Sequence, residues 1–426
     1  MYERLFWKLP KVCRKPVKAA AGFALRGCGA LLRFSPSVKR RLGRFFRFRI
    51  PSVARGLETI PPDQLGKSVL FLALGPHIRE TRLAESARLA GWNPILVYAG
   101  ELKYDPNEYF SFHAKVGSLF QMLFASWLFR GALIHVFAPD GAQAYLLCVA
   151  KYQPLVLDLN DTCKSHLLQL LPRVWERCER DAIRAADGMT HRDLRIKSLH
   201  SVDGYPLPRD NMLFIDLLSK IALRFGHERR DGEIRVVSVG FVGKGDHSVL
   251  RIARLLCGDG IHVHLYINPL QRDNDPDIAD YWNLKRQSDY FHFEEPVYGT
   301  AYWQHLNRYD FGLAAPDTLV FGETPTSCTM DSWGGAGSSR LMDYLLAELG
   351  VIISPGLRFQ WFLARRYAPV VVPAIGEFLH HPRAILEYAL REKTKARKKN
   401  LSAITTRGAA RRLGEFYAKI AKHAAE

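Results

Sequence analysis

The chain has 426 residues, 48% of them hydrophobic, which is long for one hydrophobic core and predicts two folded domains with extensions. Its seven cysteines form no CxxC pair, which excludes a zinc site of the usual cysteine spacing and favours a reducing compartment. The net charge of +18 is concentrated at the ends, in residues 1–56 and 391–426. A nucleic-acid reader more often carries its basic surface on the folded module, so no nucleic-acid partner is expected.

Residues 1–56 form a basic amphipathic extension, with 15 Lys and Arg and one acid. Its apolar run over 19–34 is interrupted by Arg26 and Arg33, and is too short and too charged to span a bilayer. We expect the extension to bind an anionic membrane surface. The alternatives are an organelle presequence and an ordinary disordered or packing extension. The large apolar residues that would enter the headgroup boundary are Trp7, Phe23, Leu31, Phe45, Phe46 and Phe48.

Alternating strands and helices begin after this extension and predict an acceptor domain over residues 66–230. Short apolar runs of the kind that form buried parallel strands occupy 68–75, 93–100, 132–139 and 154–161. Helical spacing occupies 78–91, 142–150 and 173–187. This alternation predicts an α/β layered fold with a mostly parallel sheet.

A polar break at 224–233 separates a second α/β domain, which we place at 233–375. The segment 376–426 reads as C-terminal helices with a basic tail. Two such domains of similar size predict that the ligand lies in a cleft between them. The strands expected in the second domain are 234–240, 261–268, 290–297, 309–316 and 368–373, and the helices are 247–260 and 302–307.

The stretch "GGAGSSRLMDYLLAELGVIIS" at 334–354 places a loop of glycines and serines directly before a helix and a strand. Such a loop lets backbone approach a ligand closely, and a helix N-terminus attracts anions. The part "RLMDYLLAELGVIIS" resembles the phosphate- and ribose-binding region of GT-B glycosyltransferases of the GT4-like type. Arg340 stands for the family's Lys and Asp343 for its Glu.

Other pieces resemble the same family in the same order along residues 66–375. They are "HVFAPDG", "LVLDLNDT", "ERCERDAIRAADGMTHRD", "VSVGFVGKGDHSVLRIARLL" and "YDFGLAAP". The resemblance implies an α/β GT-B fold with two Rossmann-like domains facing across a cleft. It also implies a retaining glycosyltransferase that uses a nucleotide-diphosphate sugar.

The resemblance places the donor diphosphate at the start of the helix in this stretch. The backbone N–H groups of Gly337, Ser338 and Ser339 would bind its oxygens, helped by the helix dipole. Arg340 would offer a bidentate fork to phosphate, and Asp343 would accept hydrogen bonds from the ribose. The alternatives are a serine helix cap, a surface arginine, and an aspartate paired with a nearby base.

A second donor contact is expected in the "GFVGKG" turn, where Gly240 and Gly243 bring backbone close and Lys244 adds a positive charge. Lys244 and Arg340 would stabilise the charge that develops on the leaving diphosphate, and are therefore counted as catalytic. The alternative for Lys244 is a solvated turn lysine.

The acceptor side is expected at strand ends of the first domain. Gly75 and His77 follow the first strand, and Asp140 and Asp161 end two later strands. The two carboxylates would contact the acceptor or act as a general base, and complete the catalytic set. Solvated loop residues are the alternative.

No metal or further cofactor is expected at this site. The acid-rich patch 272–280 lacks the glycine and terminal Glu of a calcium loop, and enzymes of the resembled family generally need no divalent metal.

The resemblance and the basic N-terminus together lead us to expect a cytoplasmic enzyme, peripheral on the inner face of the membrane, that moves sugar to a lipid-linked or polysaccharide acceptor. The alternative is a non-catalytic membrane- or polyanion-binding protein on a degenerate GT-B scaffold. Gly335 at the family's first Glu and Phe241 at a frequent Arg favour that alternative.

Overall fold

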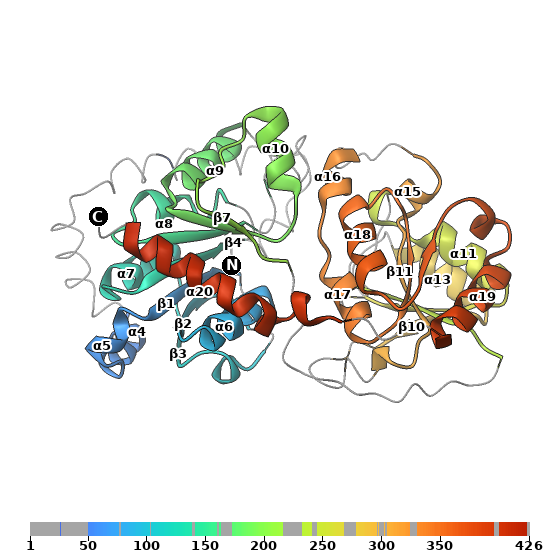
Figure 1. Ribbon diagram of the computed structural model, residues 1–426, viewed down its shortest axis with the longest axis horizontal. Helices are drawn as coiled ribbons and strands as arrows, with labels where there is room; N and C mark the ends of the chain where they lie inside the picture. Colours follow the sequence, from blue (N-terminus) through green and yellow to red (C-terminus); the bar gives the residue numbers. More distant parts are fainter. Residues whose placement is uncertain are drawn as a thin grey trace. The chain divides into compact units, whose positions relative to one another are not determined.

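The chain folds into two compact units, one made of Met1–Ile215 and Ile404–Glu426 and the other of Asp216–Ala403. Figure 1 shows the helices and strands of both units, coloured along the sequence. The computed structural model describes Arg26, Thr162, Val297, Tyr302 and the ranges 50–75, 78–102, 104–138, 141–159, 173–215, 232–240, 245–267, 278–295, 305–323, 330–395 and 400–423.

A seven-stranded, wholly parallel sheet forms the centre of the first unit, with strand order β3-β2-β1-β4-β5-β6-β7. Its central strands are largely apolar, as burial on both faces requires, and β4 and β5 each contain one buried polar residue, His135 and Asp158. The strands are β1 (Ser68–Leu74), β2 (Asn93–Ala99), β3 (Phe112–Lys115), β4 (Leu133–Ala138), β5 (Leu155–Leu159), β6 (Gly188–His191) and β7 (Asn211–Leu213).

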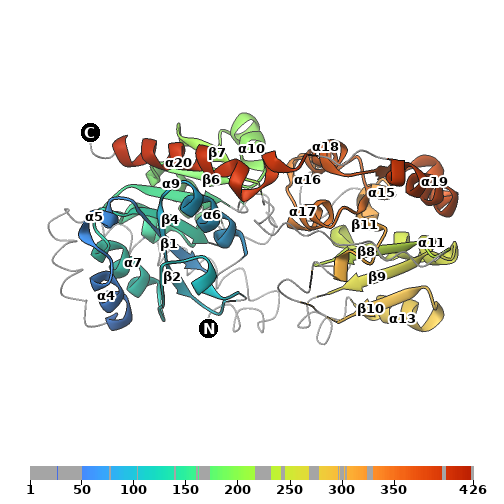
Figure 2. The same cartoon turned by 60° about the horizontal axis from the view of Figure 1, so that its bottom comes forward.

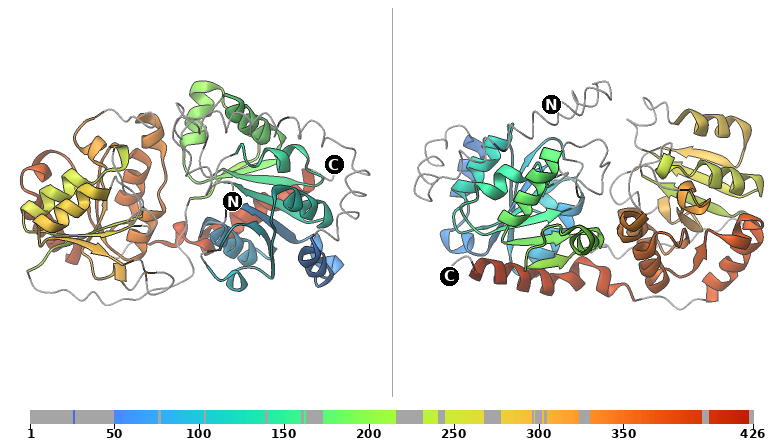
Figure 3. Two further views of the ribbon diagram at one scale, coloured as in Figure 1. Left: turned by 180° about the vertical axis from the view of Figure 1, so that it is seen from behind. Right: turned by 90° about the horizontal axis from the view of Figure 1, so that it is seen from above.

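Helices cover both faces of this sheet, with α6 and α20 on one side and α4 and α7 on the other (Figures 2 and 3). The last helix packs against α6 through a stripe of small and apolar residues. The helices of the unit are α4 (Pro51–Glu58), α5 (Pro62–Leu65), α6 (Ile78–Leu89), η2 (Pro106–Glu108), α7 (Leu119–Leu128), α8 (Tyr145–Val149), α9 (Arg173–Ala185), α10 (Arg195–Asp203) and α20 (Thr406–His423).

A chain of buried hydrogen bonds ties α20 to this sheet. Arg79 lies with Nε 2.9 Å from Asp158 Oδ1, and Thr190 Oγ1 donates to Asp158 Oδ2 at 2.6 Å. His135 Nε2 lies 3.0 Å from Thr190 Oγ1, and Nδ1 lies 2.7 Å from the Tyr417 hydroxyl. Burial lowers the pKa of His135 to about 3, so the ring is neutral. A neutral ring that donates from Nε2 and accepts at Nδ1 satisfies every one of these contacts.

The second unit contains a six-stranded parallel sheet with strand order β10-β9-β8-β11-β12-β13. The strands are β8 (Arg235–Val239), β9 (His262–Tyr266), β10 (Phe291–Glu294), β11 (Phe311–Ala314), β12 (Gly350–Ile353) and β13 (Val371–Pro373). The helices are η3 (Gly245–His247), α11 (Leu250–Gly258), α13 (Ala279–Gln287), α15 (Asp317–Val320), α16 (Met330–Gly335), α17 (Ser339–Leu346), α18 (Arg358–Tyr367), η5 (Gly376–Leu379) and α19 (Pro382–Lys395). The short η6 (Ser402–Ile404) leads back to α20.

The predicted α/β class with two parallel, Rossmann-like sheets is confirmed. Several details differ from the sequence interpretation. The helix expected at 142–150 is limited to α8, and the strands β3, β6 and β7 were not predicted. The segment 376–426 is divided, because α19 belongs to the second unit and α20 to the first.

Candidate functional site

The strand order of the second sheet reverses between β8 and β11, and open α/β sheets bind ligands beyond the carboxyl ends of strands at such a point. The two strands pair only through residues 236–237 and 311–312. Beyond that pairing, the Tyr344 hydroxyl lies between them: it accepts a hydrogen bond from Val239 N–H at 3.3 Å and donates one to the Leu313 carbonyl at 3.2 Å. Tyr344 therefore anchors α17 at the switch point.

The sequence of β11 makes room for this anchor. A Cβ on Gly312 would lie 2.2 Å from Cγ of Tyr344, so only glycine lets the ring approach the strand. The ring is fully buried, and burial raises the pKa of the Tyr344 phenol to about 12. The hydroxyl therefore keeps its proton and remains a donor at neutral pH.

Arg340 lies one helical turn before Tyr344, and residues four apart share a helix face. Its guanidinium lies beside Gly240, the residue that follows β8: a Cβ on Gly240 would lie 3.6 Å from Nη2 and 4.0 Å from Nε of Arg340. Gly240 has a φ of +93°, a conformation that side-chain-bearing residues rarely adopt. The structure thus brings together two of the predicted donor residues, Gly240 and Arg340, at the carboxyl end of β8.

The other predicted residues of this helix lie at its start and in its second turn. Ser338 is the N-cap residue of α17, but its hydroxyl makes no capping hydrogen bond, unlike the cap serine proposed as the alternative. Ser339 is the first helical residue, and Gly337 precedes the cap in the loop. Asp343 Oδ2 accepts a hydrogen bond from the Tyr302 hydroxyl at 3.0 Å. A carboxylate has lone pairs for about four hydrogen bonds, so this contact is compatible with a second partner.

The helix that follows β8 has a different N-terminus. Asp317 accepts hydrogen bonds from Arg251 N–H at 2.9 Å and Ile252 N–H at 3.0 Å, and the Ser248 hydroxyl donates to it at 2.6 Å. Asp317 is 3% exposed. The first turn of α11 thus already binds a carboxylate from within the chain, which supplies the negative charge that the helix dipole favours.

A second arginine, which the sequence interpretation missed, lies against the end of α16, the helix that precedes the loop before α17. A Cβ on Gly334, in the last turn of α16, would lie 2.5 Å from Nε of Arg358, the first residue of α18. The predicted glycine loop is thus shorter than expected, because Gly334 and Gly335 are helical. Position 358 is 18 residues beyond Arg340 in the sequence, and no local pattern there indicates contact with α16.

The carboxyl end of β1 is the corresponding switch point of the first sheet, between β1 and β4. Gly75 lies there with a φ of +95°, and its N–H donates to the Ala99 carbonyl at 3.3 Å. After β4, Gly141 N–H donates to the buried Glu179 carboxylate at 3.1 Å, and Tyr205 donates to the same carboxylate. Glu179, which the sequence interpretation did not single out, thus holds the residue that follows predicted Asp140.

Several predicted site residues lie outside the described residues. They are His77, Asp140, Asp161, Phe241, Gly243 and Lys244, together with the six apolar residues of the predicted membrane extension. Within the extension, Arg26 is described, and its Nη1 lies 2.6 Å from Asp181 on α9. Among the helices that the structure describes, none is long and apolar enough to cross a membrane.

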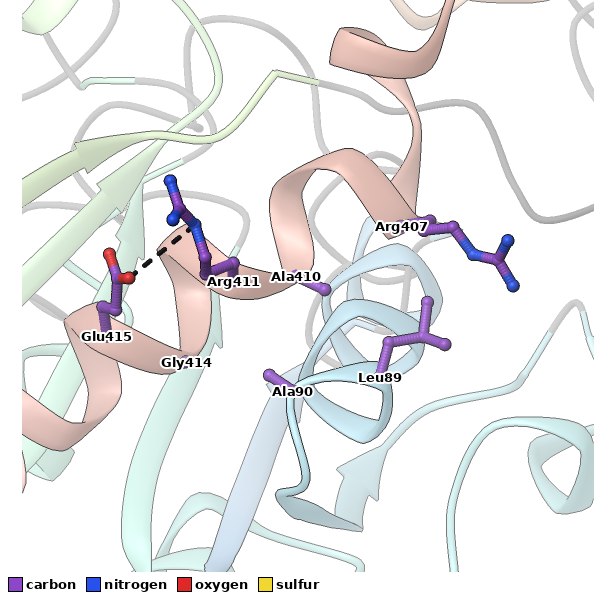
Figure 4. Close-up of a pocket in the computed structure, with 7 residues that line it drawn as sticks. All are labelled: Leu89, Ala90, Arg407, Ala410, Arg411, Gly414 and Glu415. Carbon is purple, nitrogen blue, oxygen red and sulfur yellow. Dashed lines mark ion pairs between the residues drawn. The ribbon is translucent and has the colours of Figure 1, made fainter.

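A surface pocket of about 540 Å³ lies in the first unit between α6 and α20 (Figure 4). It contains none of the predicted site residues. The residues that line it are Leu89, Ala90, Arg407, Ala410, Arg411, Gly414 and Glu415. In Figure 4, Arg411 turns toward Glu415, which pairs its charge within α20.

No family model and no curated protein matches the chain. Solved structures match most of it. Anabaena HepE in complex with UDP-glucose aligns over 84% of this chain and 98% of its own, with 10% identity and a TM-score of 0.54. A glycosyltransferase from Rickettsia africae aligns over 83% and 98%, with 10% identity and a TM-score of 0.52. The chain has the GT-B fold. In the second unit, two of the predicted donor residues lie beside each other, Arg340 on α17 and Gly240 directly after β8.

Proposed function

We propose that the chain is a glycosyltransferase that uses a nucleotide-diphosphate sugar, and that the start of α17 binds the diphosphate. The observation that carries the proposal is the position of α17. Tyr344 fastens this helix to the switch point, and Arg340 lies beside Gly240 at the carboxyl end of β8. The N-terminus of α11, which follows β8 in the sequence, is already capped by Asp317, whereas the Ser338 side chain makes no capping hydrogen bond to α17, so we assign the anion to α17.

The chemistry follows from where charge develops. Cleavage of the bond between sugar and diphosphate leaves negative charge on phosphate oxygens, and fixed donors aimed at those oxygens accelerate that step. The N–H groups of Ser338 and Ser339, the α17 dipole and the Arg340 guanidinium supply such donors. Asp343, held by Tyr302, would accept from the ribose hydroxyls. We assign Lys244 the second positive charge, and retention of configuration as the outcome.

The solved structures support a nucleotide-sugar donor, since HepE was solved with UDP-glucose. We propose a lipid-linked or polysaccharide acceptor at the inner face of the membrane, contacted by Gly75, His77, Asp140 and Asp161. The basic charge of residues 1–56 supports a membrane surface as the place of reaction. We propose that the donor reaction itself needs no metal.

Calorimetric titration with UDP-, GDP- and CMP-linked sugars tests the proposal. One donor should bind, and Arg340→Ala should weaken its binding and turnover by about 10- to 100-fold, the equivalent of one or two charge-assisted hydrogen bonds. Arg365→Ala, an exposed arginine on α18, is the matched control and should change neither. Absence of binding by every donor would instead support the non-catalytic alternative, which Gly335 favours.

A liposome pelleting assay tests the membrane part separately. The full chain should sediment with vesicles that contain anionic lipid, and a chain without residues 1–49, which keeps α4 whole, should not. Equal sedimentation of both chains would contradict the proposed role of the extension, without affecting the donor assignment.

A further inference from the structure

Three histidines lie close together in the second sheet, on its edge strand β10 and the neighbouring strand β9. Figure 2 shows these two strands side by side. His262 and His264 are two residues apart on β9, so their side chains leave the same face. The register pairs His264 with His292 on β10. The rings of His264 and His292 stack with centroids 4.4 Å apart, and those of His262 and His292 with centroids 5.2 Å apart.

The ring nitrogens are close enough to share one ion. His262 Nδ1 lies 2.9 Å from His292 Nε2, and one ligand nitrogen from each of the three rings lies within 4.8 Å of the others. A tetrahedral ion with metal–nitrogen bonds of about 2.0–2.1 Å needs nitrogens about 3.3 Å apart. The observed separations bracket that value, and small rotations about χ2, a broad torsion in histidine, would adjust them.

A carboxylate fixes the tautomer of the central ring. His264 Nδ1 lies 2.7 Å from Glu294 Oε1, so Nδ1 carries the proton and Nε2 carries the lone pair. Nε2 of His264 is buried and has no hydrogen-bond partner among the described residues. A buried nitrogen without a partner is unfavourable unless something binds it. Metal-ligating histidines almost always donate their other ring N–H to a carboxylate, carbonyl or water, as His264 does here.

The histidine cluster is distinct from the α17 site, at which no metal was expected. The cluster lies on β9 and β10, on one side of β8 in the strand order, whereas the α17 site lies between β8 and β11.

We propose that His262, His264 and His292 bind one divalent transition-metal ion. Three imidazoles favour Zn²⁺, Cu²⁺, Ni²⁺ or Co²⁺ over Mg²⁺ and Ca²⁺, which prefer oxygen ligands. The ion would join β9 to the edge strand β10. The proposal does not depend on the glycosyltransferase assignment, because the cluster shares no residue with the donor site.

Titration of the full chain, free of a histidine tag, with ZnCl₂ after chelator treatment tests the proposal. We expect one Zn²⁺ per chain with micromolar or tighter affinity. His264→Ala should weaken binding at least 100-fold, and Glu294→Gln, which leaves the three ligands in place, should weaken it about 10- to 100-fold. His380→Ala with His381→Ala is the matched control: this exposed adjacent pair lies in the same unit, and its loss should change nothing.

Circular dichroism of each metal-free variant checks its fold. Should His264→Ala fail to fold, two other measurements decide the question. They are the Zn²⁺ affinity of Glu294→Gln and the visible absorption spectrum of the Co²⁺-loaded wild type, which should show a four-coordinate ion. Absence of Zn²⁺ binding by the wild type would overturn the proposal. So would unchanged affinity in a folded His264→Ala or Glu294→Gln variant.

Discussion

Gly312→Ala should displace the helix that carries the proposed donor site. A Cβ at position 312 would lie 2.2 Å from Tyr344 Cγ and 2.3 and 2.6 Å from the two Cδ atoms. Carbon atoms pack best at about 3.5–4.0 Å, so the ring must retreat by more than about 1 Å. That retreat also breaks the hydrogen bonds of its hydroxyl to β8 and β11. Overpacking costs about 1–3 kcal/mol and each lost hydrogen bond about 1 kcal/mol, so we expect a total of about 3–5 kcal/mol.

Urea denaturation followed by circular dichroism would measure the loss of stability, and hydrogen exchange of peptides from α17 would locate it. Gly258→Ala is the matched control, because a Cβ on that helical glycine meets nothing within 4 Å. Tyr344→Ala removes the clash, so Gly312→Ala should cost little in that background. A cost below about 1 kcal/mol, or the same cost with and without the Tyr344 ring, would refute the reasoning.

Three further outcomes are expected. Asp158→Ala should remove the buried carboxylate that pairs with Arg79 and reduce the free energy of unfolding by about 3–5 kcal/mol. Glu387→Ala, in an exposed pair, should change it by less than about 1 kcal/mol, and thermal melts compare the two. Burial lowers the pKa of His135 from its ordinary value of 6.5 to about 3, so below about pH 6.5 the unfolded chain takes up a proton that the folded chain does not. The free energy of unfolding should therefore fall with decreasing pH, by up to about 1.4 kcal/mol per pH unit. Denaturation at several pH values should show a flatter slope for His135→Gln. Asp317→Ala should remove the cap of α11, cost about 0.5–2 kcal/mol and speed hydrogen exchange in its first turn.

Much of the fold could be predicted from the sequence because the central strands are buried on both faces. The segments 68–75 and 132–139 are largely apolar runs, and β1 and β4 occupy them. The edge strand β3 has the sequence FHAK, which is short and half polar, and so resembles a loop. Its strand conformation depends on pairing with β2, a contact that no local pattern indicates.

The candidate site was predictable only in part, for a similar reason. Arg340 and Asp343 were predicted from the family resemblance alone. The bridging role of Tyr344 depends on where β8 and β11 separate, which is a property of strand order rather than of residue type. The cap on α11 comes from Asp317, more than 60 residues along the chain from the N–H groups that it binds. Long-range pairings of this kind appear only once the chain is folded.

Hydrogen exchange of the full chain with and without its best-binding nucleotide tests the central claim most directly. If the diphosphate binds at the start of α17, the N–H groups around Ser339 should exchange more slowly in the complex. The start of α11 should stay unchanged, since Asp317 already caps it. Nucleotide binding that protects the first turn of α11, or that leaves residues 337–340 unprotected, would contradict the account.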